Sequence, residues 1–134
     1  MPQELNPWVS RSPATAPATA ATAAWPRPTG PSSPQRGVPA PALHDQLPGA
    51  PQSVAARLWI VGTHGGAGET ALAALSPGWA ATDHTWPLVR SAGAAPVLLV
   101  ARSHLSGLQS AQAAARQWAC GLVPYVDVIG LVVV

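Results

Sequence analysis

The chain has 134 residues, 16 prolines, a single cysteine and no lysine. This length holds one small domain and excludes a multidomain enzyme, and one cysteine excludes a disulfide scaffold. The formal net charge is +2 with only 9% charged residues, and no run of arginines marks a nucleic-acid groove, so no direct nucleic acid contact is expected.

Residues 1–52 are predicted to form a disordered tail rich in alanine and proline. Twelve of the sixteen prolines lie there, together with only five leucine, isoleucine and valine residues. Such a segment has too little apolar surface to offset the entropy lost on ordering, and spaced prolines favour extended geometry. Trp8 and Trp25 within it are either incidental aromatics or docking anchors for a partner protein.

The remainder of the chain, 53–134, is expected to fold as one domain. Its first element is a buried strand over 58–61, a continuous apolar run that leads at once into the glycine-rich turn 62–68. A helix over 69–76 follows and ends at the Pro-Gly pair behind it. Residues 77–95 are expected to be irregular.

A second strand is predicted over 97–100, followed by a long helix and a third strand over 128–134. Ser103 is expected to cap the helix and Gly121 to end it. Its apolar stripe is predicted to comprise Leu105, Leu108, Ala111, Ala115 and Trp118. Because the strands are apolar throughout and alternate with helices, the fold class is α/β with a parallel sheet and flanking helices.

The third strand runs to the end of the chain with no turn or helix behind it. An apolar strand in this position is an exposed edge unless something covers it. We therefore expect the domain to be truncated at its carboxyl end.

The segment whose residues suggest ligand binding is the glycine-rich turn between the first strand and the first helix. It reads His-Gly-Gly-Ala-Gly-Glu-Thr over residues 64–70. Consecutive glycines let backbone N–H groups converge on an anion, and a helix N-terminus adds partial positive charge. In such loops a lysine reaches the terminal phosphates and a threonine or serine binds magnesium.

This turn resembles the phosphate-binding loop of the ParA and MinD ATPases, which reads Lys-Gly-Gly-x-Gly-Lys-Thr. His64 stands at the family's signature lysine, Glu69 replaces the phosphate-binding lysine, and Thr70 takes the place of the magnesium ligand. The later strands and the alanine-rich helix are also similar, over about 80 residues in all, and the lysine-free composition suggests an uncharacterised actinobacterial group.

The resemblance implies a P-loop (Rossmann-like) fold that binds ATP or ADP with Mg²⁺. The residues that it implies for nucleotide binding are His64, Gly65, Gly66, Ala67, Gly68, Glu69 and Thr70. Among them, Thr70 is the implied metal ligand, and His64 is expected to add positive charge when protonated.

Two departures argue against hydrolysis. A carboxylate at Glu69 repels a phosphate by about 4 kcal/mol at 4 Å and an effective dielectric constant near 20, and the lysine's attraction is lost as well. In such ATPases an aspartate at the end of a neighbouring apolar strand holds Mg²⁺ through water. Asp83 is the one candidate at the expected place, and no apolar run precedes it. Asp127 begins a strand rather than ending one. We therefore expect a domain that does not hydrolyse ATP.

An alternative interpretation needs no nucleotide. An acidic residue in the first turn of a helix gains about 0.3–1 kcal/mol from the helix dipole, so Glu69 can fill the anion site itself. The domain is then a non-catalytic interaction module that pairs with an active relative or forms a homo-oligomer in a partition or secretion assembly. Trp79 and Trp86 either cover the sheet or, if exposed, are candidates for its partner surface.

Other candidate sites are weaker. His64, His84 and His104 follow strands, but their spacing matches no established metal-ligand pattern. Cys120, at a helix end, is expected to pack rather than react. No stretch approaches eighteen uninterrupted apolar residues, so no membrane span is expected, and the location is predicted to be cytoplasmic.

Overall fold

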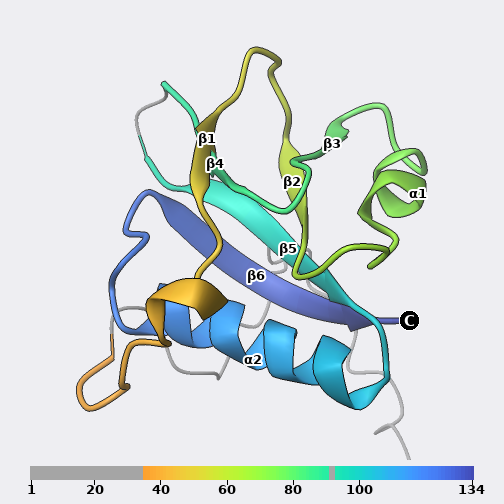
Figure 1. Cartoon of the computed structure of the whole chain (residues 1–134). Helices are drawn as coiled ribbons and strands as arrows, with labels where there is room; N and C mark the ends of the chain where they lie inside the picture. Colours follow the sequence, from red (N-terminus) through yellow and green to blue (C-terminus); the bar gives the residue numbers. More distant parts are fainter. Residues whose placement is uncertain (1–34, 91–92) are drawn as a thin grey trace, which may run out of the picture. The chain divides into compact units, whose positions relative to one another are not determined.

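The computed structural model describes residues 35–90 and 93–134 (Figure 1). Its elements are a 3₁₀ helix η1 (Leu43–Asp45), β1 (Gly49–Pro51), β2 (Leu58–Gly62), α1 (Glu69–Ala73), β3 (Trp79–Ala81), β4 (Trp86–Leu88), β5 (Ala95–Ala101), α2 (Leu105–Ala119) and β6 (Val126–Val133). The predicted α/β class is confirmed, as are strands at the three predicted places.

The main sheet has the strand order β3-β2-β5-β6, and every neighbouring pair in it is parallel. The predicted parallel sheet is therefore confirmed. From β2 the chain passes through α1 to β3 on one side, whereas β5 lies on the other side of β2. The order thus reverses between β2 and β5, which is the position where open α/β sheets bind ligands beyond the carboxyl ends of their strands.

The expectation that residues 77–95 are irregular was wrong. Two short strands lie there: β3 pairs with β2, and β4 pairs with β1 in a separate two-stranded parallel sheet. Each has only three residues, and β3 is half-buried throughout. Strands this short carry too little hydrophobic pattern to be recognised, so partners elsewhere in the chain decide their structure.

Two apolar clusters stabilise the domain, one on each face of the main sheet. The larger contains Trp59, Trp86 and Leu99 together with Ala114 of α2. The smaller contains Ile60 and its neighbours on the α1 side. Trp86 is 0% exposed and packs on the sheet in this cluster, as the first of its two expected places requires. The second, a partner surface, was wrong because a fully buried indole is unavailable to a partner.

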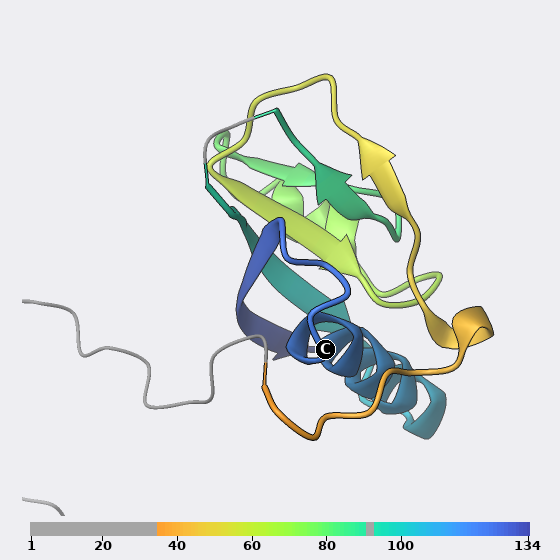
Figure 2. The same ribbon diagram turned by 90° about the vertical axis from the view of Figure 1, so that its left-hand side faces the viewer.

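The folded part begins earlier than the predicted boundary at residue 53. Figure 2 shows the segment before β1 running along α2, and several hydrogen bonds fix it there. The amide of Gln117 exchanges two 2.9 Å hydrogen bonds with the backbone of Leu47, and Arg116 donates to the carbonyls of Pro39 and Ala40. Polar contacts of this kind leave no hydrophobic signal in the sequence. Trp8 and Trp25 lie outside the described residues.

α2 also differs from its predicted orientation. The residues that it buries are Gly107, Ala111, Ala114, Gln117 and Ala119. Leu105 is 73% exposed and Leu108 and Ala115 are exposed too, because the helix approaches the sheet through small side chains. The helix begins one residue later than expected, with His104 as its N-cap. Gly121, at a φ of 89°, follows its last turn as predicted.

The edge strand β6 exposes one apolar row, as its sequence predicts. The exposed apolar side chains of the strand are those of Ile129, Leu131 and Val133, and the exposed Val134 follows them. α1 is shorter than its expected span 69–76 and ends at Ala73. None of the helices in the described part of the chain is long and apolar enough to cross a membrane.

Candidate functional site

Three loops meet at the carboxyl edge of the main sheet, where the strand order reverses. They follow β2 (residues 63–68), β3 (82–85) and β5 (102–104). Together they enclose a surface hollow of about 360 Å³, here called the loop hollow. It is lined by Gly66, Ala67, Gly68, Glu69, Thr70, Ala71, Asp83, His84 and Arg102.

The glycine loop has the backbone geometry that its sequence suggests. Gly66 and Gly68 have φ values of 73° and 97°, in the left-handed region that other residues rarely adopt. Gly68 is the N-cap of α1, so the N–H groups of its first turn lack intrahelical partners. Thr70 is exposed at the hollow, whereas the side chain of Ala67 is fully buried in the smaller core cluster. Ala67 can therefore contribute only its backbone.

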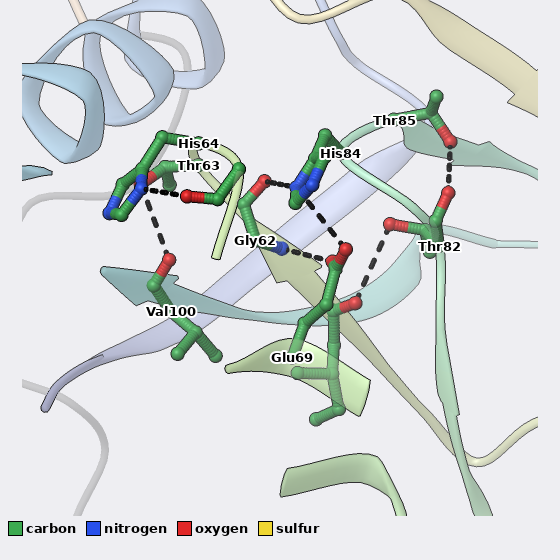
Figure 3. A network of polar contacts seen from close by, with 10 residues as sticks. Gly62, Thr63, His64, Glu69, Thr82, His84, Thr85 and Val100 are labelled. Atoms are coloured by element: carbon green, nitrogen blue, oxygen red, sulfur yellow. Dashed lines mark hydrogen bonds and ion pairs between the residues drawn. The ribbon is translucent and has the colours of Figure 1, made fainter. Parts of the chain in front are cut away.

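Glu69 occupies the position of the expected lysine, and its carboxylate is directed toward the end of β2 (Figure 3). The residue is 5% exposed. Its Oε2 accepts a 2.5 Å hydrogen bond from the Gly62 N–H, and its Oε1 lies 3.2 Å from His84 Nδ1. Glu69 therefore binds one amide of the glycine-rich turn 62–68 itself, that of Gly62.

His84 connects this carboxylate to the end of β2. Its Nδ1 lies 3.1 Å from the Gly62 carbonyl as well as near Glu69. Because both neighbours are acceptors, Nδ1 carries a proton and donates, which leaves Nε2 with a lone pair when the ring is neutral. Asp83 and His84 both have left-handed backbone conformations, with φ values of 57° and 58°.

His64 and His104 have structural roles instead. His64 Nε2 accepts a hydrogen bond from the Arg102 N–H at 3.0 Å, and its Nδ1 contacts the Gly65 carbonyl. His104 Nδ1 accepts from the Gly107 N–H as the cap of α2. The Nε2 lone pair of His64 is therefore used by the Arg102 N–H.

The three histidines do not form one set. The rings of His64 and His104 lie 5.3 Å apart between centroids. His84 instead belongs with Glu69 and Asp83: these three residues offer possible metal-ligand atoms within 4.8 Å of one another.

Arg102 is the arginine of the loop hollow, and it was not predicted from the sequence. It follows the end of β5, and its Nε donates a 2.8 Å hydrogen bond to the Gly66 carbonyl, 36 positions earlier. The signal was present, because Arg102 lies two residues after the predicted strand 97–100, whose carboxyl end is at the same sheet edge as the glycine loop.

Comparisons with known proteins identify a family. The profile of the family of unknown function DUF6668 matches residues 56–134, more than half of the chain. The chain belongs to DUF6668. The DUF6668 match starts just before β2 and includes all four strands of the main sheet and the loop hollow. No curated protein and no solved structure matches the chain.

Proposed function

We propose that this DUF6668 domain binds a phosphate-bearing ligand, a nucleotide such as ATP or ADP with Mg²⁺, at the loop hollow and does not hydrolyse it. The observation that carries the proposal is the contact of Arg102 with Gly66. It brings a guanidinium group onto a glycine loop at the point where the strand order reverses. On this proposal the loop is a modified phosphate-binding loop like that of the ParA and MinD ATPases.

Arg102 replaces the missing lysine in this scheme. Its Nε is used by Gly66, and the remaining guanidinium N–H groups are available to phosphate oxygens in the fork geometry that arginine favours. The N–H groups of Gly68 and the first turn of α1 supply further donors. The exposed hydroxyl of Thr70, which lines the hollow, is the group for Mg²⁺.

The orientation of Glu69 reduces the expected electrostatic penalty. Its carboxylate accepts one hydrogen bond from the Gly62 N–H and faces His84, so its charge is partly compensated on the protein side. Two acidic residues, Glu69 and Asp83, still line the hollow with one arginine, Arg102. That balance is poor for stabilising the additional negative charge of a phosphoryl-transfer transition state. We therefore propose that this domain, in a cytoplasmic protein, binds the nucleotide without hydrolysing it.

Calorimetry with Mg-ATP and with Mg-ADP on the full chain tests this proposal. We expect micromolar binding by the wild type and a loss of about tenfold or more in Arg102→Gln, since a charge-assisted hydrogen bond contributes about 1.5–3 kcal/mol. The control is Arg90→Gln, which removes the same charge at an exposed position outside the hollow. Absence of binding by the wild type, or equal affinities of the two variants, contradicts the proposal.

A second candidate function is supported by the exposed apolar row on β6. Unpaired edge strands with apolar side chains join other chains readily, and this favours a protein-interaction module or a homo-oligomer. Light scattering of the wild type and of Leu131→Arg over a range of concentrations tests the homo-oligomer. A concentration-dependent dimer that the substitution abolishes supports the homo-oligomer, and a wild type that stays monomeric excludes it.

A further inference from the structure

We propose that Glu69, Asp83 and His84 bind a divalent transition-metal ion of the Zn²⁺ type. The three side chains come from two loops, at the start of α1 and after β3, and their possible ligand atoms lie within 4.8 Å of one another. All three line the loop hollow, so an ion has access from solvent. The site needs no nucleotide and is independent of the function proposed above.

Each side chain can supply a lone pair to an ion. Each oxygen of Glu69 has one partner, Gly62 for Oε2 and His84 for Oε1, and a carboxylate can accept about four hydrogen bonds. His84 Nδ1 lies 3.2 Å from Glu69 Oε1 and 3.1 Å from the Gly62 carbonyl, so an ion binds here by replacing the Nδ1 proton, which is released to solvent. Asp83 is exposed, and within the described residues its carboxylate has no hydrogen-bond or ion-pair partner.

Glu69 and His84 already have the spacing of two ligands of one ion. His84 Nδ1 and Glu69 Oε1 are 3.2 Å apart, close to the separation of two ligands on a tetrahedral zinc ion with bonds of about 2.0–2.1 Å. Glu69 is buried and its Oε2 is held by the Gly62 N–H, so its carboxylate is fixed in place.

The donor set indicates the class of ion. One imidazole and two carboxylates suit Zn²⁺, Co²⁺ or Mn²⁺, whereas Mg²⁺ and Ca²⁺ prefer oxygen donors alone. Zn²⁺ binds nitrogen and oxygen ligands at about 2.0–2.2 Å, so two of its ligands are at most about 4.4 Å apart. Donors within 4.8 Å reach that geometry through small side-chain rotations.

Charge favours a dication as well. Glu69 and Asp83 place two carboxylates in a hollow where the basic group is Arg102, and its guanidinium is bonded to Gly66. The carboxylate of Glu69 is nearly excluded from solvent, so its field is weakly screened. A dication at this point neutralises the excess negative charge.

Co²⁺ titration of the full chain, followed by its visible absorption and then by displacement with Zn²⁺, tests the site with the metal alone. We expect one equivalent to bind, and expect Asp83→Asn and His84→Asn each to weaken binding by more than about tenfold, since even outer-shell losses cost about 10–100-fold. Asparagine tolerates the left-handed backbone at both positions, so both variants are expected to fold.

The matched controls are Asp45→Asn and His44→Asn. His44 and Asp45 form an exposed pair with 3.4 Å between Nε2 and Oδ2, so these variants remove the same groups far from the hollow in sequence. A wild type with no cobalt absorption, or hollow variants that bind as tightly as these controls, overturns the proposal. As a second readout, Zn²⁺ should raise the melting temperature of the wild type but not of Asp83→Asn. Because no nucleotide is present, failure of nucleotide binding leaves this test unaffected.

Discussion

Glu69 Oε2 accepts a 2.5 Å hydrogen bond from the Gly62 N–H, and this contact joins the first residue of α1 to the last residue of β2. The two residues are the ends of the glycine loop, so the bond closes the loop on itself. The acidic residue at the lysine position is thereby a structural link as well as a source of negative charge.

Replacing Glu69 by alanine should destabilise the domain. The change leaves the buried N–H of Gly62 without an acceptor, which costs about 1–3 kcal/mol in the free energy of unfolding. Glu69→Gln retains an oxygen for that N–H and should lose less. Urea denaturation of both variants measures the difference, with the exposed Asp45→Ala as the control. Equal losses for the alanine and glutamine variants would show that the hydrogen bond is not the cause.

The sequence was sufficient for the parts of the fold with a strong hydrophobic pattern. The strands β2, β5 and β6 are long and apolar, and their parallel pairing follows from the helices between them. β3 and β4 have three residues each and depend on pairing with distant strands. The buried face of α2 was predicted wrongly because leucines usually mark a buried face. This helix packs closely against the sheet, and the buried face consists mostly of glycine and alanine.

The candidate site was predictable only where its residues are neighbours in the sequence. The loop 64–70 stands out as a motif, and its Gly66 and Gly68 have left-handed backbone conformations. Arg102 and His84 reach the same hollow from other strands. Their positions depend on the order β3-β2-β5-β6, which hydrophobic patterns do not specify.

Gly107→Ala should destabilise the domain although it lies in a helix. In an open helix the substitution gains about 1 kcal/mol. Here the added Cβ would lie 2.4 Å from the Arg102 carbonyl oxygen and 3.0 Å from His64 Nε2, so we expect a net loss of about 1–3 kcal/mol in the free energy of unfolding. Gly65→Ala is the control, since nothing lies within 4 Å of its Cβ. A Gly107→Ala variant as stable as the wild type in urea would contradict the close approach.

Gln117→Glu should loosen the segment before β1 from α2. The amide of Gln117 both donates to and accepts from Leu47, and a carboxylate cannot donate, so its second oxygen would face the Leu47 carbonyl. We expect a loss of about 1–3 kcal/mol, together with faster hydrogen exchange at the Leu47 amide. Gln112→Glu makes the same charge change at an exposed position of the same helix. Unchanged exchange at Leu47 would rule out this attachment.

Tyr125 gives the domain a dependence on alkaline pH. Burial raises the pKa of its phenol above the ordinary value of 10.0, because desolvation disfavours the phenolate. The stabilising contribution of the neutral phenol is therefore fully present below pH 10 and is lost as the pH rises through the raised pKa of the folded state. Tyr125 is the single tyrosine of the chain, so the ultraviolet absorbance of tyrosinate follows it alone. We expect a midpoint above 10 in the native protein that falls in denaturant, and Tyr125→Phe should remove this part of the alkaline loss of stability. Equal midpoints in the native and denatured chains would refute the effect of burial.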